Sequence, residues 1–258
     1  LLLRKQGGKH LLMIDKNRQF YKSSVLVRDR LNQEKPDSVA VIPVIHALHA
    51  NDPKNLLESG INKNYSDILC DLDYADAIVV LTDAQKKGIF ERHGSGRIHS
   101  IGHSYTSSAM KNQFEHRDRF RIVCMARYSP EKNQHLAIEA FAKVNEKFPG
   151  SVLDFYGSGG VSNKILENLK NLVITLGLQS CVRLHSWCDN PAEIYESAGL
   201  SILTSQGEAF SLTILESLFH GCPPIAFEVP YGPIQLIGDG LTGCLVPFGD
   251  VEKMASRI

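Results

Sequence analysis

The 258-residue chain carries 28 Lys and Arg against 28 Asp and Glu, so its formal net charge is zero. A dedicated nucleic-acid-binding protein has a positive excess, and this balance argues against that class. Hydrophobic residues make up 43% and charged residues 22%, ordinary values that exclude wholesale disorder. The apolar stretches are far shorter than the ~18–20 residues of a membrane-spanning helix. The six cysteines form no CxxC pair, which predicts free thiols and a reducing, cytoplasmic setting.

The N-terminal segment is basic. Residues 1–35 hold nine Lys and Arg but only three Asp and Glu. Contact with a polyanion is one interpretation, and an ordinary solvated surface is the commoner one.

The first hundred residues show an incomplete alternation of strands and helices. Strands are predicted at Ser38–His46, Asp76–Leu81 and Ile98–Ile101, and helices at Leu57–Leu72 and Asp83–His93. Thr82 or Asp83 is expected to cap the second helix. Three strands are few for a parallel sheet, so the sequence predicts a first domain, residues 1–110, whose first half is missing.

A polar stretch then separates this domain from a second one, residues 111–258. Residues 104–120 lack an apolar period and are rich in Ser, Thr, Asn and charge, which is typical of a linker.

Beyond the linker, short β-rich runs alternate regularly with helical patterns. The predicted strands are Arg121–Ala126, Ser151–Tyr156, Cys181–His185, Leu200–Thr204, Pro224–Phe227 and Gly243–Val246. The predicted helices are Asn133–Lys147, Asn163–Leu176, Pro191–Ser197, Leu212–Phe219 and Ile234–Ile237. This alternation predicts an α/β domain with a doubly wound parallel sheet, which binds ligands at the carboxyl ends of its strands.

Two loops at such strand ends carry charge or glycine. Arg127 and Lys132 follow the first strand and would suit a diphosphate, because Arg binds oxygens in pairs and Lys is a point charge. The alternative is an ordinary solvated loop. The run from Gly157 to Gly160 follows the second strand, where a simple turn is favoured over a ligand contact.

The strongest signal is a pair of glutamates eight residues apart. Glu208 comes just before a predicted helix, and Glu216 lies about two turns into it. The helix start offers unpaired amides to a phosphate, and Glu216 could accept hydrogen bonds from ribose hydroxyls. Two glutamates at a given spacing also occur by chance.

The sequence around this pair resembles the family 4 retaining glycosyltransferases, which have the GT-B fold of two Rossmann-like domains. Residues 205–227, SQGEAFSLTILESLFHGCPPIAF, resemble that family's E-x7-E block, and Arg127 with Lys132 matches its Arg-x4-Lys pair. Tyr231-Gly232-Pro233 is most similar to the bacterial branch that glucosylates poly(glycerol phosphate) teichoic acid.

The resemblance implies roles for these residues. Arg127 and Lys132 would neutralise the leaving diphosphate, Glu216 would hold the ribose, and Glu208 would contact the donor sugar. Amides around four consecutive residues would contact phosphate and sugar: Phe210, Ser211, Leu212 and Thr213. Ala209 and Ser211 depart from the family, because many relatives have glycine there.

A histidine at the end of the first-domain strand would also face the donor sugar. His46 is favoured and His49 is nearly as good, so both join Glu208 as catalytic candidates. Asp71 and Asp73 form a DxD sequence, but they fall at the end of a predicted helix rather than on a strand-end loop. No metal or other cofactor is therefore predicted.

The resemblance implies transfer of glucose from UDP-glucose to a hydroxyl of a polyanionic polymer, with retention at the anomeric carbon. Alternatives are a UDP-GlcNAc transferase acting on serine-rich adhesins and a non-catalytic partner subunit of the same fold. A dehydrogenase is a third hypothesis, disfavoured because no GxGxxG follows a first strand. The location expected is cytoplasmic, with contact to the inner membrane face left open and oligomeric state undetermined.

Overall fold

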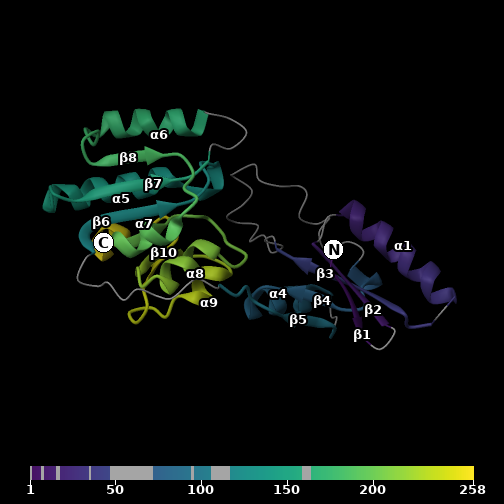
Figure 1. Ribbon diagram of the computed structural model, residues 1–258. Coiled ribbons are helices and arrows are strands. Elements are labelled where there is room, and N and C mark those ends of the chain that lie inside the picture. The colour runs from purple at the N-terminus through teal and green to yellow at the C-terminus, as the bar shows by residue number, and fades with distance from the viewer. Residues whose placement is uncertain are drawn as a thin grey trace. The chain divides into compact units, whose positions relative to one another are not determined.

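The chain forms two compact units, Leu1–His103 and Ser104–Ile258. The computed structural model describes residues 2–6, 9–15, 18–34, 36–46, 72–93, 96–105, 117–158 and 164–258. Each unit has its own sheet and its own helices (Figure 1). The predicted domain boundary, after residue 110, falls at 106–116, outside the described residues.

The first unit is built on a five-stranded sheet in the order β1-β2-β3-β4-β5. Its strands are β1 (Leu2–Gln6), β2 (Lys9–Asp15), β3 (Val39–Ile45), β4 (Ile78–Val80) and β5 (Ile98–Ser100). Its helices are α1 (Arg18–Glu34), the short 3-10 turn η1 (Leu72–Tyr74) and α4 (Asp83–His93). The β1–β2 pair is antiparallel, and the pairs from β2 to β5 are parallel.

The prediction of only three strands here is wrong. The basic N-terminal segment forms the β1–β2 hairpin and α1. β1 was missed because it is short and three of its five residues are polar, as an edge strand tolerates. The predicted helix 57–72 lies outside the described residues except for Leu72, which begins η1.

The predicted cap of α4 is confirmed. The Gln85 amide donates to the Thr82 hydroxyl at 3.1 Å, and the Gln85 side-chain oxygen accepts from the Leu81 amide at 2.9 Å. The Gln85 side-chain nitrogen also donates to the Ile45 carbonyl at 3.3 Å. Thr82 and Gln85 thus satisfy buried backbone groups where β3 and β4 end.

The second unit is a doubly wound sheet of six parallel strands in the order β11-β10-β9-β6-β7-β8. Its strands are β6 (Asp118–Met125), β7 (Val152–Tyr156), β8 (Val182–His185), β9 (Ala198–Leu203), β10 (Pro224–Glu228) and β11 (Cys244–Pro247). Its helices are η3 (Pro130–Lys132), α5 (Gln134–Lys147), α6 (Lys164–Thr175), α7 (Pro191–Ser197), α8 (Leu212–Phe219), α9 (Gly232–Leu236) and α10 (Val251–Arg257).

The predicted α/β fold class is confirmed, and the six strands and five helices predicted for this half are all present. The predicted linker was drawn too long, because β6 begins at Asp118. Helix α10 was not predicted.

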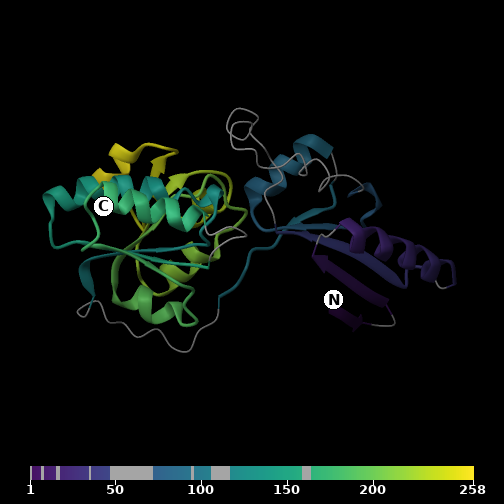
Figure 2. The ribbon, with the colours of Figure 1, turned by 90° about the horizontal axis from the view of Figure 1, so that it is seen from above.

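Helices cover both faces of this sheet (Figure 2). Ile122 and Cys124 of β6 belong to the same buried cluster as Phe141 of α5. The alternate residues Val123 and Met125 belong instead to a cluster with Ile194 and Tyr195 of α7. This alternation is what a strand buried on both faces requires, and it leaves the strand ends available for loops that bind ligands.

Gly157 lets β7 end close to the loop that follows β6. A Cβ atom at this position would collide with the carbonyl of Ala126, whereas nothing lies within 4 Å of a Cβ at Gly150. The glycine predicted to make a simple turn therefore also provides a close approach between the two strand ends.

We expect Gly157→Ala to lower the free energy of unfolding by about 1–3 kcal/mol, because the backbone carbonyl must move. The matched variant Gly150→Ala should change it by no more than about 0.5 kcal/mol. Urea denaturation measures both, and equal stability of the two variants would contradict the close approach.

Candidate functional site

The site begins where the strand order of the second unit reverses. β6 and β9 are adjacent, and the chain continues from β6 towards β7 and β8 but from β9 towards β10 and β11. In such sheets the loops after the two central strands diverge and leave a crevice for a ligand. Here those loops are residues 126–133 and 204–211, which contain the predicted Arg127, Lys132 and Glu208.

Three hydrogen bonds join these two loops. The Thr204 hydroxyl donates to the Lys132 carbonyl at 2.8 Å, and the Gln206 amide donates to the Glu131 carbonyl at 3.0 Å. The Lys132 ammonium donates to Glu208 Oε1 at 2.7 Å, with 16% and 14% of the two side chains exposed. This short, largely buried ion pair links the two loops at the point where the strand order reverses. The sequence alone did not predict this contact.

Arg127 stands apart from that bridge. Its side chain is 67% exposed and reaches Glu131 at 3.6 Å, a long surface ion pair that stabilises little. The Arg127 carbonyl, however, is fixed by a 2.6 Å hydrogen bond from the Gln134 side chain. The guanidinium is therefore available to a ligand while its backbone is held in place.

The start of α8 closes the site. Ser211 caps the helix from a left-handed conformation (φ 75°, ψ 86°), and its hydroxyl accepts from the Ile214 amide at 3.4 Å. Glycine adopts this conformation more easily than serine does. The amides at the start of an eight-residue helix, with its positive dipole end, are suited to bind an anion.

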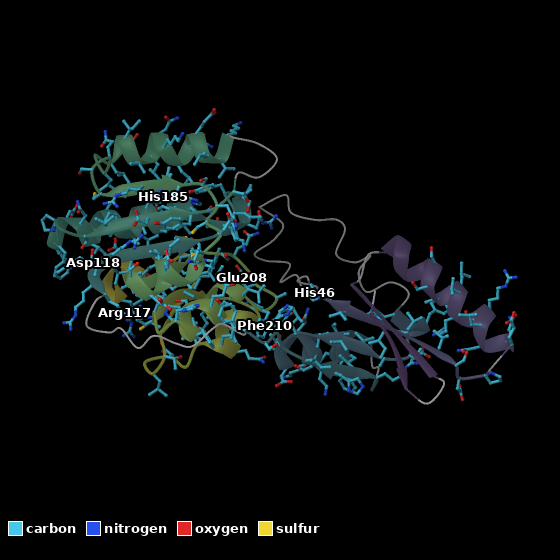
Figure 3. The ribbon with its side chains drawn as sticks, viewed as in Figure 1. His46, Arg117, Asp118, His185, Glu208 and Phe210 are labelled. Carbon is cyan, nitrogen blue, oxygen red and sulfur yellow. The ribbon has the colours of Figure 1, made fainter. Side chains whose placement is uncertain are left out.

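The loop ahead of α8 is held from behind by the segment after β10. Glu208 and Tyr231 form a β-bridge, in which the Tyr231 amide donates to the Glu208 carbonyl at 2.6 Å. A Cβ on Gly232 would collide with the Phe210 carbonyl. Figure 3 labels Glu208 and Phe210 on this loop, and Phe210 is buried. The backbone on both sides of Glu208 is thus fixed by main-chain contacts.

Glu216 lies about two turns along α8. Its side chain is half-buried, and burial raises the pKa of its carboxyl group above the ordinary value. In the described part of the chain, no hydrogen bond or ion pair of this carboxylate is seen. A partly desolvated acceptor left unpaired costs stability and is suited to ligand hydroxyls.

The second unit therefore brings most of the predicted site residues to one edge of its sheet. Those that lie there are Arg127, Lys132, Glu208, Phe210, Ser211, Leu212, Thr213 and Glu216. His46 belongs to the first unit, where it directly follows β3 and stacks on His103 at 5.3 Å between ring centroids. Burial, and then the charge of His46, lower the pKa of His103. His49 lies outside the described residues.

Two histidines assigned no partner in the sequence are paired in the structure. His185 Nε2 lies 3.1 Å from the buried Asp154, and His220 Nδ1 lies 3.1 Å from Glu196. No linear pattern in the sequence signals these partners. Trp187 is 56% exposed just after β8.

The DxD sequence gives no metal site among the described residues. Asp73 is exposed in η1, and Asp71 lies outside them. Over the same residues, no group of three or more His, Cys, Asp or Glu side chains is placed to hold a metal ion.

Comparison with protein families identifies the family of this chain. The model described as "Glycosyl transferases group 1" matches residues 107–258, more than half of the chain. The chain belongs to the group 1 glycosyltransferase family. The matched region contains the predicted Arg127, Lys132, Glu208 and Glu216.

Two curated proteins are similar to large parts of this chain. An exopolysaccharide phosphotransferase of Streptomyces coelicolor is 36% identical over 189 residues, 71% of this chain and 19% of that protein. A poly(glycerol-phosphate) alpha-glucosyltransferase of Bacillus subtilis is 26% identical over 220 residues, 83% of this chain and 31% of that protein. The chain thus spans less than a third of either relative.

The fold also matches a solved structure. The pneumococcal O-GlcNAc transferase GtfA, in complex with UDP and GlcNAc, superposes with a TM-score of 0.73 at 23% identity. The match covers 89% of this glycosyltransferase chain and 47% of that one. None of the helices in the described part has the length and apolar character needed to cross a bilayer.

The raised pKa of Glu216 predicts a pH-dependent cost to stability. Folding favours the protonated carboxyl, so this group destabilises the fold once pH rises above its ordinary pKa of 4.5. We expect Glu216→Gln to melt at a higher temperature than the unchanged chain at pH 7. The difference should vanish below about pH 4.5. A difference that stays constant between pH 4 and 8 would contradict the desolvation of Glu216.

Proposed function

We propose that this chain binds a UDP-sugar through its second unit and transfers the hexose to a hydroxyl group with retention of anomeric configuration. The observation that carries the proposal is the convergence of Arg127, Lys132 and Glu208 beside the start of α8. This helix carries Glu216, whose carboxylate has no partner among the described residues. Family membership gives the reaction class, and the site geometry supports the assignment of residues to it.

The diphosphate would lie between the first loop and α8. Arg127 is exposed and can bind two phosphate oxygens, and the first amides of α8 supply further donors. Lys132 has three ammonium hydrogens, so it can donate to Glu208 and to a phosphate oxygen at the same time. We propose that these protein cations, rather than a metal ion, balance the charge of the leaving group.

Glu216 would accept hydrogen bonds from the ribose hydroxyls, and Trp187 would lie beside the nucleobase. The carboxylate is partly desolvated and unpaired within the described residues, which makes it a ready acceptor. The exposure of Trp187 at the carboxyl end of β8 supports its assignment to the ligand rather than to the core.

Glu208 would act at the sugar. Lys132 holds its carboxylate. In the proposal, this carboxylate would lie close to the positive charge that grows on the anomeric carbon during transfer. In the proposed step, the bond from this carbon to the diphosphate oxygen breaks, and the acceptor oxygen bonds to the same face. The acceptor proton passes to the departing phosphate, so no separate protein base is needed. The roles of His46 and His49 at the donor sugar stay predictions.

We favour glucose as the hexose and a polyanionic polymer such as poly(glycerol phosphate) teichoic acid as the acceptor. The Bacillus subtilis relative supports this choice by its name. GlcNAc transfer to a protein is the second candidate, supported by the similarity to the GtfA structure with UDP and GlcNAc. The described cysteines are free, which supports a cytoplasmic location.

Titration calorimetry with UDP-glucose and UDP-GlcNAc tests the donor. Tighter binding of UDP-glucose is the expected result, and tighter binding of UDP-GlcNAc would favour the second candidate. If UDP itself does not bind, the donor-site assignment is wrong.

Substitutions test the residues. Glu216→Ala should weaken UDP binding by about 1.5–3 kcal/mol, because it removes a charged hydrogen-bond partner. Lys132→Ala should weaken it by a similar amount and leave the domain folded. Lys170→Ala, on the exposed side of α6, is the matched control and should bind UDP normally. Unchanged UDP affinity in both Glu216→Ala and Lys132→Ala would contradict the proposed contacts to the diphosphate and the ribose.

A further inference from the structure

A buried chain of polar side chains lies at the carboxyl end of α8, away from the capped start of the helix. His220, which directly follows α8, is buried and lies between two hydrogen-bond partners. Its Nδ1 is 3.1 Å from Glu196 Oε1 on α7, and its Nε2 is 3.1 Å from the hydroxyl of Tyr105.

The donors in this chain follow from the chemistry of its members. An ionised carboxylate can only accept, so Nδ1–H of His220 donates to Glu196. In the neutral imidazole, Nε2 then accepts, and the Tyr105 hydroxyl donates to it. Tyr105 also packs edge-on against Phe219, with 4.8 Å between ring centroids. The phenol is therefore fixed by both a hydrogen bond and a ring contact.

Backbone hydrogen bonds hold the same region. Arg117 donates to the carbonyls of Tyr195 at 2.5 Å and Ala198 at 3.0 Å, and also to the carbonyl of His220. The Tyr195 hydroxyl donates to the Thr213 carbonyl inside α8 at 3.1 Å. Carbonyls at the ends of α7 and α8 thus gain donors that the helices themselves cannot supply.

Glu216 lies one turn before His220 on α8, and the His220 amide donates to the Glu216 carbonyl at 3.0 Å. Burial raises the pKa of the Tyr105 phenol, and the charges of Glu216 and Glu196 raise it further. Both tyrosines that hold this helix, Tyr105 and Tyr195, are thus close enough to Glu216 to respond to its charge. A helix of eight residues is not stable alone, so these anchors decide where Glu216 lies.

We propose that Tyr105 and His220 are positioning residues for nucleotide binding: the chain Tyr105–His220–Glu196 fixes the carboxyl end of α8 and so holds Glu216 in place for the ribose. The inference rests on the proposed function and adds to it a residue ahead of the matched family region, which begins at residue 107. Tyr105 touches no ligand in this proposal; it acts through the helix.

A double-mutant cycle on the full 258-residue chain separates positioning from general stability. UDP affinity is measured by calorimetry for the unchanged chain, Tyr105→Phe, Glu216→Gln and the double variant. Tyr105→Phe keeps the ring contact with Phe219 and removes only the hydrogen bond to His220. We expect it to weaken UDP binding about three- to tenfold, and to have no further effect once Glu216 is replaced. Thermal unfolding checks that each variant is folded.

Tyr74→Phe is the matched control. Tyr74 is exposed in the first unit, and its variant should bind UDP as the unchanged chain does. Normal affinity in Tyr105→Phe, or an equal loss with and without Glu216, would overturn the positioning role while leaving the proposed function intact. Failure of the unchanged chain to bind UDP would instead overturn the proposed function, and the positioning role with it.

Discussion

The 2.7 Å ion pair between Lys132 and Glu208 is the contact on which the site depends. It joins the loops after β6 and β9, which a doubly wound sheet sends in opposite directions. Two charges are removed from water to form it, and such a pair persists only where geometry is good and neighbouring hydrogen bonds support it. Thr204 and Gln206 provide that support by tying the two backbones together. Arg127 and the start of α8 are placed on either side of the bridge.

Two groups around this ion pair are held less favourably than the ion pair itself, one without a hydrogen-bond partner and one in a strained backbone conformation. Glu216 is partly desolvated without a partner among the described residues, and Ser211 adopts a conformation that suits glycine better. Each feature costs stability in the free protein. A ligand that supplies hydroxyl donors to Glu216 and an anion to the start of α8 would recover part of that cost, because binding then satisfies groups that folding leaves unpaired.

The sequence predicted the second unit well because its signals are local. Strand and helix periods gave every strand and every α-helix before α10, and the E-x7-E block located α8 and the loop that precedes it. The β1–β2 hairpin was not predicted because a short, polar edge strand has no clear period.

The partners of Lys132, His185 and His220 could not be predicted from the sequence for another reason. Glu208 is 76 residues from Lys132, and Tyr105 is 115 residues from His220, so only the fold brings them together.

We propose that the loops after β6 and β9, with α8, form a nucleotide-diphosphate site. A crystal structure of the chain with UDP is the decisive measurement. We expect the diphosphate to lie between Arg127, Lys132 and the first amides of α8, with the ribose hydroxyls bonded to Glu216. Nucleotide bound away from these residues, with the Lys132–Glu208 bridge and the Glu216 carboxylate untouched, would contradict it.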